Sequence, residues 1–242
     1  IGAKLDRLIA ELDTQQYDVY LILNVNDKSA TKNIPHLSRM CVYDAADLNQ
    51  LGYRPICEKI LPGSCHFPVL RFYKDHPSYS YYWLVEYDVE FTGQWSLLMD
   101  AFKPSTADFI AAHIARFDIM GNWNWHWWHH YNQSGVPIQN SIRSFHPISR
   151  YSYQALKYID SYQQKGYSAH SELMIPTCLY HAGMELEDFG GIGEFVKSEN
   201  ENKFYINSRQ EKELCTLRFR PSFSHDIMSN GIRNKIYHPV KF

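Results

Sequence analysis

The chain has 242 residues, of which 45% are apolar and 21% charged, so it can bury a large core and has the composition of a globular protein. Its net charge of −2 argues against a nucleic-acid-binding protein that works through a broad basic face. No stretch approaches the roughly 20 apolar residues of a membrane span.

The first third of the chain alternates amphipathic helices with apolar strands. Residues 1–16 predict a helix because four apolar side chains recur at helical spacing: Leu5, Leu8, Ile9 and Leu12. Residues 17–27 read as a strand, and residues 39–53 as a short strand with a helical turn. A further helix is expected to begin at Pro68 and to end before Pro77.

Residues 81–93, YYWLVEYDVEFTG, begin as a strand that should be buried on both faces and continue into three carboxylates: Glu86, Asp88 and Glu90. On an extended chain these alternate positions place all three side chains on one face. Carboxylates so arranged repel each other unless solvent, hydrogen bonds or a cation compensates. This local conflict is the first indication of a functional site.

The second half of the chain is less regular. Residues 107–115 predict a strand or a short helix, and residues 152–166 a helix that Gly166 closes. Residues 170–183 predict another helix, in which Pro176 either causes a kink or marks the true start. Residues 215–223 alternate as a strand. We therefore expect one α/β domain over residues 1–242, with a mixed, mainly parallel sheet flanked by helices.

Five cysteines are scattered without a CxxC pair: Cys41, Cys57, Cys65, Cys178 and Cys215. An odd, dispersed set favours reduced thiols over a disulfide framework. We expect a cytoplasmic location, with peripheral association at a membrane as an open alternative.

The D-x-E pair formed by Asp88 and Glu90 offers the ligands that hard divalent cations prefer. Mg²⁺ and Mn²⁺ are often held by one or two carboxylates together with substrate phosphates. Such an ion would stabilise the charge that develops on a departing nucleoside diphosphate. The alternative is a pair of solvated carboxylates at the end of a strand.

A strand that ends in D-x-D or D-x-E is also the metal-binding signature of GT-A glycosyltransferases, and residues 83–95, WLVEYDVEFTGQW, resemble a GT-A-like set named DUF3405. The similarity continues in HPISRYSYQAL and GYSAHSELMIPTCLYHAG, and covers roughly residues 17–185. It implies a GT-A-like, Rossmann-like fold with a nucleotide-binding half (1–100) and an acceptor-binding half (101–242). Because GT-A folds open with a strand, we expect an upstream strand to be lost or replaced here.

The segment SELMIPT resembles the catalytic segment of core-2-like inverting enzymes, in which a carboxylate deprotonates the acceptor hydroxyl. Glu172 is the matching position, and its alternative is a carboxylate that stabilises a helix N-terminus. Asp188, in MELEDFGG, is a second candidate base. The core-2-like enzymes work without the metal motif, so the two similarities come from different templates.

The C-terminal KIYHPVK is similar to GT-A tails in which a late histidine binds the metal and a lysine binds the diphosphate. This similarity implies His238 as a third metal ligand beside Asp88 and Glu90, and Lys241 as a nucleotide-binding residue. Glu86 is expected to orient the site. Arg218 and Arg220 could hold phosphate, or could form an exposed basic pair.

The resemblance also suggests nucleotide contacts at Asn24, Asp44, Asp47 and Asp88, each with an ordinary alternative as a strand-end or helix-capping residue. Residues 122–135, NWNWHWWHHYNQSG, read as an aromatic loop that packs against the core or stacks acceptor sugars through Trp125, Trp127 and Trp128. His126, His129 and His130 have a spacing that permits zinc on a helix, without the cysteine or HExxH pattern that would support it.

Together these features predict a glycosyltransferase that moves a sugar from a nucleoside diphosphate-sugar donor to a hydroxyl acceptor such as a glycan, with Mn²⁺ or Mg²⁺ as cofactor and an inverting displacement. The main alternative is a non-catalytic carbohydrate-binding module in which the carboxylates hold a structural Ca²⁺. A metal-dependent phosphoesterase would need more clustered His and Asp ligands than this stretch supplies.

Overall fold

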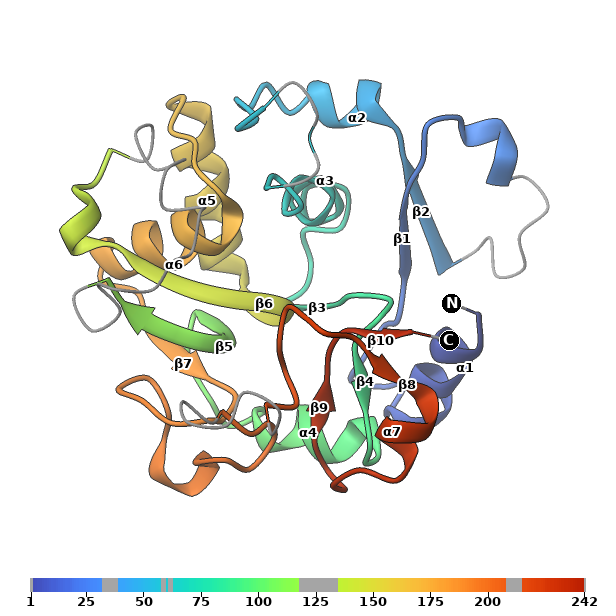
Figure 1. The fold of residues 1–242 in the computed structure, drawn as a ribbon. Helices are drawn as coiled ribbons and strands as arrows, with labels where there is room; N and C mark the ends of the chain where they lie inside the picture. Colours follow the sequence, from blue (N-terminus) through green and yellow to red (C-terminus); the bar gives the residue numbers. More distant parts are fainter. Residues whose placement is uncertain are drawn as a thin grey trace.

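The structure is a computed structural model that describes residues 2–31, 39–57, 60, 63–117, 135–207 and 215–241. It confirms an α/β fold, in which a four-stranded sheet carries helices and an apolar core on each face (Figure 1). Side chains alternate along the central strand β5 (Phe109–Arg116): Phe109 and Ala111 join one core, Ile110 and Ala112 the other. This period of two is what a strand buried on both faces requires.

The four-stranded sheet has the order β3 (Tyr81–Val85), β6 (Ile142–Ser152), β5, β7 (Leu186–Asp188). β6 runs antiparallel to both β3 and β5, and only β5 and β7 are parallel. The expected predominance of parallel strands is therefore not found in this sheet. β5 is a strand rather than a short helix, and register shifts between Ile110 and Ala115 place a bulge in its middle.

Three further strand pairs lie outside this sheet. β1 (Leu21–Asn24) and β2 (Met40–Tyr43) are parallel, β4 (Glu90–Phe91) and β9 (Ile236–Tyr237) are antiparallel, and β8 (Phe223–Ser224) and β10 (Val240–Lys241) are parallel. The strand expected over residues 215–223 is wrong, because Leu217 makes only an isolated bridge. Pro221 has no N–H to donate, and its carbonyl accepts the side chain of Arg218 within the same loop.

The helices of the first half are α1 (Gly2–Glu11), α2 (Ala45–Asn49), α3 (Phe67–Asp75) and α4 (Trp95–Ala101). α1 confirms the predicted helical spacing, with Leu5 and Leu8 buried, and Pro68 lies in the first turn of α3 as expected. Short 3-10 turns lie at Lys28–Thr31, Ile138–Asn140 and Ser198–Asn200. None of the helices in these described ranges is long and apolar enough to cross a membrane.

Two helices cover one face of the sheet in the second half, α5 (Tyr153–Gln164) and α6 (Ser171–His181), and α7 (His225–Ser229) lies near the C-terminus (Figure 1). Gly166 follows α5 with a φ of 84°, the left-handed conformation that suits a glycine after a helix. Pro176 lies inside α6, whose start is at Ser171. The Glu172 carbonyl, which loses its usual N–H partner there, lies 3.5 Å from the Ser144 hydroxyl.

Candidate functional site: an acidic turn with a histidine

The acidic stretch after β3 is a turn and not the extended strand that the alternation predicted. The Glu86 N–H donates to the Pro147 carbonyl at 2.8 Å, and the Val89 N–H closes the turn on the Glu86 carbonyl at 3.2 Å. The three carboxylates therefore do not share one face. Glu86 and Asp88 point to one common place, and Glu90 points to another.

Glu86, Asp88 and His238 each offer a ligand atom within 4.8 Å of the others. They come from two distant segments, which are joined where the Val240 N–H of β10 donates to the Asp88 carbonyl at 2.8 Å. The predicted pair of Asp88 and His238 is thus brought together. Glu86, expected only to orient the site, stands where Glu90 was expected.

The ring of His238 is oriented by its backbone surroundings. Its Nδ1 donates to the Arg218 carbonyl at 2.8 Å, because a carbonyl can only accept, and Nε2 faces Oδ1 of Asp88 at 3.6 Å. Burial lowers the pKa of His238, which favours the neutral ring with a lone pair on Nε2. A histidine that donates one nitrogen to a carbonyl and presents the other is the usual arrangement for a metal ligand.

The two carboxylates of Glu86 and Asp88 repel each other beside His238, and a bound cation would relieve this repulsion. Burial, and next the charge of Asp88, raise the pKa of Glu86 to about 7. Oδ1 of Asp88 is buried and has no hydrogen-bond partner among the described residues. Two carboxylates and a neutral imidazole form a donor set that suits Mn²⁺ and similar divalent ions.

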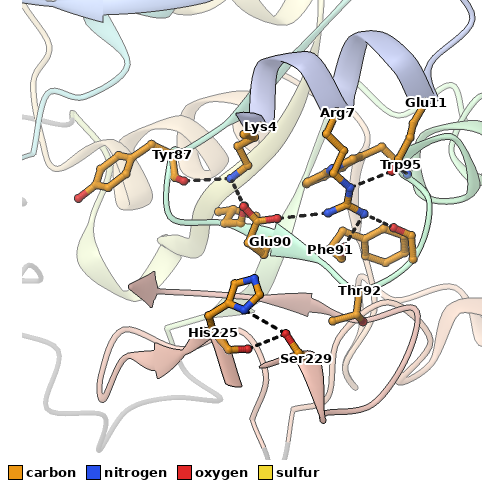
Figure 2. A network of polar contacts seen from close by, with 12 residues as sticks. Lys4, Arg7, Glu11, Tyr87, Glu90, Phe91, Thr92, Trp95, His225 and Ser229 are labelled. Carbon is orange, nitrogen blue, oxygen red and sulfur yellow. Dashed lines mark hydrogen bonds and ion pairs between the residues drawn. The ribbon is translucent and has the colours of Figure 1, made fainter. Parts of the chain in front are cut away.

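Glu90 does not belong to this group, which corrects its predicted role as a metal ligand. Its carboxylate is buried beneath α1 and lies 3.4 Å from Lys4 Nζ and 3.3 Å from Arg7 Nη1 (Figure 2). Two cations from one helix already compensate this charge. The D-x-E spacing predicted a shared face, but the turn at residues 86–89 separates Asp88 from Glu90.

Glu172 lies in the first turn of α6, where the ring of His170 accepts its backbone N–H at 3.3 Å. Burial, and next the charge of Glu86, raise the pKa of Glu172 to about 8, whereas Arg143 and the His146 N–H oppose this shift. The charge of Glu86 therefore acts on Glu172. A carboxylate with a pKa in this range suits a general base.

Asp188, the second candidate base, lies in β7 and is buried. Its Oδ1 accepts the Tyr205 hydroxyl at 2.8 Å and the Gly190 N–H at 3.0 Å, and its Oδ2 accepts the Ile114 N–H at 2.9 Å. Burial raises its pKa to about 7. These bonds hold the bulge of β5 against β7, so the geometry favours a structural role.

The candidate nucleotide contacts of the first half lie at the ends of β1 and β2. Asn24 ends β1, while Asp44 caps α2 in a reciprocal pair with Asp47, the ordinary capping role weighed from the sequence. Lys28 forms an ion pair with both aspartates. A nucleotide-binding role for Asn24, Asp44 and Asp47 stays a prediction.

The basic residues of the C-terminal segment lie close to His238. Lys241 is exposed at the end of β10, and the charge of Arg220 adds to burial in lowering the pKa of His238. Arg218 stacks on Phe223, with its guanidinium carbon 3.9 Å from the ring centre. The two arginines do not share a strand face, because the expected strand is absent.

The aromatic loop with Trp125, Trp127 and Trp128, and with His126, His129 and His130, lies outside the described residues. A role for these tryptophans in acceptor binding stays a prediction.

Arg143 and His146 are site residues that sequence analysis missed. Both are buried on β6, and Arg143 opposes the raised pKa values of Glu172 and Asp188. The sequence signal that could have identified them is the presence of basic side chains within a strand whose other residues are buried.

Two surface pockets lie away from the acidic turn. One of about 480 Å³ lies at the opposite end of β3 and is lined by Tyr79, Tyr81 and Tyr153, with Asp108 and Gln154 among its polar groups. A smaller one of about 250 Å³ lies beside Arg7 and Met228.

Comparison of the chain with protein-family models, with curated proteins and with solved structures finds no match.

Proposed function

We propose that this chain is a metal-dependent glycosyltransferase that moves a sugar from a nucleoside diphosphate-sugar to a hydroxyl acceptor. The observation that carries the proposal is the convergence of Glu86, Asp88 and His238, with the histidine oriented as in a metal site. These three residues would hold Mn²⁺ or Mg²⁺. When bound, the ion would neutralise the diphosphate as it leaves.

Glu172 is the base of this proposal. It would accept the proton of the acceptor hydroxyl in an inverting displacement, and its burial beside Glu86 supports this role by holding its pKa above the usual range of a carboxyl. Its place in the first turn of α6 fixes the carboxylate on a rigid element, and Arg143 favours its charged form. Both features hold the base in position, with the ring of His170 3.8 Å from its carboxylate.

The basic residues of the C-terminal segment would contact the diphosphate. Lys241 follows the β10 residue that bonds to the acidic turn, and Arg220 acts electrostatically on His238. Cations beside a carboxylate-held metal suit a ligand with two phosphates.

A direct experiment is to incubate the chain with a panel of nucleoside diphosphate-sugars and Mn²⁺, and to measure release of the diphosphate and transfer to simple glycans. Metal-dependent turnover of one donor supports the proposal. If no donor reacts, and if UDP and GDP with Mn²⁺ do not raise the unfolding temperature, the proposal is wrong.

A carbohydrate-binding module is the second candidate function, because the tyrosine-lined pocket at the far end of β3 suits stacking of a sugar ring. Thermal unfolding distinguishes the two functions. Stabilisation by glycans alone, with no effect of nucleotides and Mn²⁺, favours the module.

A further inference from the structure

The α1 helix contacts the turn at residues 86–89, which carries Glu86 and Asp88, through the network of polar contacts shown in Figure 2. Lys4 donates to the carbonyl oxygens of Glu86 at 3.1 Å and of Tyr87 at 3.0 Å, and also to that of Val89. A single ammonium therefore binds three carbonyls of one tight turn, while Glu90 supplies its counter-charge at 3.4 Å. Burial lowers the pKa of Lys4 and Glu90 raises it.

The remaining carbonyl of the turn, that of Asp88, is bound from the opposite side by the N–H of Val240. All four carbonyls of residues 86–89 are thus held, three by α1 and one by β10. With the backbone fixed, the side chains of Glu86 and Asp88 can meet His238, which precedes Val240 by two residues on the same segment.

Arg7 lies one helical turn after Lys4 and provides a natural comparison. It donates to the carbonyls of Phe91 and Gly93, at 3.0 and 2.6 Å, and pairs with Glu90 at 3.3 Å. Its contacts begin where the turn ends. The two residues therefore share the same helix and the same counter-charge, but only Lys4 contacts the backbone that presents Glu86 and Asp88.

We infer that Lys4 is a positioning residue for a divalent-cation site at Glu86, Asp88 and His238. The inference rests on the proposed function, which places the metal there. Lys4 does not touch the metal in this proposal. It holds three carbonyls so that two carboxylates stay directed at one point, and loss of such outer contacts typically weakens metal binding about 10- to 100-fold.

The test must separate this positioning from simple charge, because removing a cation near the site would by itself strengthen metal binding. We therefore pair each substitution with Glu90→Gln, so that one positive and one negative charge are lost together. Lys4→Met/Glu90→Gln removes the contacts to the turn. Arg7→Met/Glu90→Gln makes the same change of charge and leaves those contacts in place.

The measurement is Mn²⁺ affinity, obtained from the electron paramagnetic resonance signal of the free ion, with thermal unfolding of each variant as the measure of folding. We expect the Lys4 double variant to bind Mn²⁺ about tenfold or more weakly than the wild type, and the Arg7 double variant to stay within about threefold. Lys4→Gln/Glu90→Gln, which keeps a shorter N–H donor, should recover part of the affinity.

Equal affinities in the two double variants, or tighter binding after loss of Lys4, would overturn the inference and leave the proposed function standing. A wild-type chain without saturable Mn²⁺ binding would overturn the proposed function and the inference with it. If Lys4→Met/Glu90→Gln does not fold, the Lys4→Gln/Glu90→Gln variant decides: affinity equal to that of the Arg7 double variant contradicts a positioning role.

Discussion

Nε2 of His238 lies 3.6 Å from Oδ1 of Asp88, while Nδ1 of the same ring donates to the Arg218 carbonyl. A neutral imidazole thus presents a lone pair to a carboxylate oxygen that has no other partner among the described residues. Two acceptors that face each other repel unless a cation or a proton lies between them. This relationship makes the ligand set of Glu86, Asp88 and His238 testable.

We expect Asp88→Asn and His238→Gln each to weaken Mn²⁺ binding at least about tenfold, because each removes one ligand of the proposed site. Glu90→Gln should leave the affinity within about threefold, since the Glu90 carboxylate is already paired with Lys4 and Arg7. Isothermal titration with MnCl₂ measures all three variants. A loss with Glu90→Gln as large as with Asp88→Asn would restore the ligand set predicted from the D-x-E spacing.

Glu172→Gln tests the proposed base. It should lower the transfer rate by about 10²- to 10⁴-fold, the usual contribution of general base catalysis, while leaving the affinity for Mn²⁺ and nucleoside diphosphate nearly unchanged. Glu199→Gln, at an exposed position, is the matched control. Single-turnover rates and nucleotide titration separate the two effects. Unchanged transfer by Glu172→Gln would remove the residue from the mechanism.

The sequence predicted the elements whose signals are local. α1, α3 and α5 follow from apolar spacing, from a proline in the first turn and from a terminal glycine. α3 and α5 lie close to their predicted ranges, whereas α1 ends at Glu11, before the end of the predicted range 1–16. The mainly antiparallel pairing of the four-stranded sheet was not predictable in this way. Strand direction depends on which distant segments pair, and β6 inserts antiparallel between β3 and β5.

The candidate site shows the same division. Asp88 and His238 were predicted from motifs, and the structure brings them together. Where the Glu90 carboxylate points depends on its ion pairs with Lys4 and Arg7, which are more than 80 positions away along the chain. No spacing within EYDVE carries that information, so the choice between Glu86 and Glu90 needed the fold.

A pH effect is expected from His66, which is 3% exposed and has no hydrogen-bond partner for either ring nitrogen within the described part of the chain. Burial, and next the charge of His170, lower its pKa to about 3. Burial, and next the charge of His66, also lower the pKa of His146 on β6 to about 3. The folded chain therefore keeps His66 neutral where the unfolded chain protonates it.

His66 therefore does not lower the free energy of unfolding above pH 6.5. The free energy of unfolding falls as the pH drops from 6.5 toward 3, because only the unfolded state binds a proton at His66 in that window. Relative to His66→Phe, the wild type should lose up to about 1.4 kcal/mol in the free energy of unfolding per pH unit. Urea unfolding from pH 7 to pH 4 measures the difference. His225→Gln, an exposed histidine, should follow the wild type, and identical slopes for wild type and His66→Phe would contradict the expectation.

Arg150 supports the connection from α4 to β5 and offers a test of the fold itself. It is 2% exposed, and its guanidinium donates to the carbonyls of Phe102, Ser105 and Ala107 while it lies 4.2 Å from the ring centre of Tyr81. Arg150→Met would remove the arginine donors from all three carbonyls, of which that of Phe102 keeps the Ser105 N–H at 3.1 Å. Each buried acceptor left without a hydrogen bond costs about 1–3 kcal/mol.

We therefore expect Arg150→Met to lower the free energy of unfolding by about 3 kcal/mol or more, measured by urea denaturation. Arg71→Met is the control, because Arg71 pairs with Asp75 at 3.0 Å across one exposed helical turn and should contribute only about 0.5 kcal/mol. The loss for Arg150→Lys should fall between these two values, since an ammonium keeps the charge but has fewer donors than the guanidinium. A change for Arg150→Met no larger than that for Arg71→Met would show that water satisfies these carbonyls, and that the loop after α4 does not depend on the arginine.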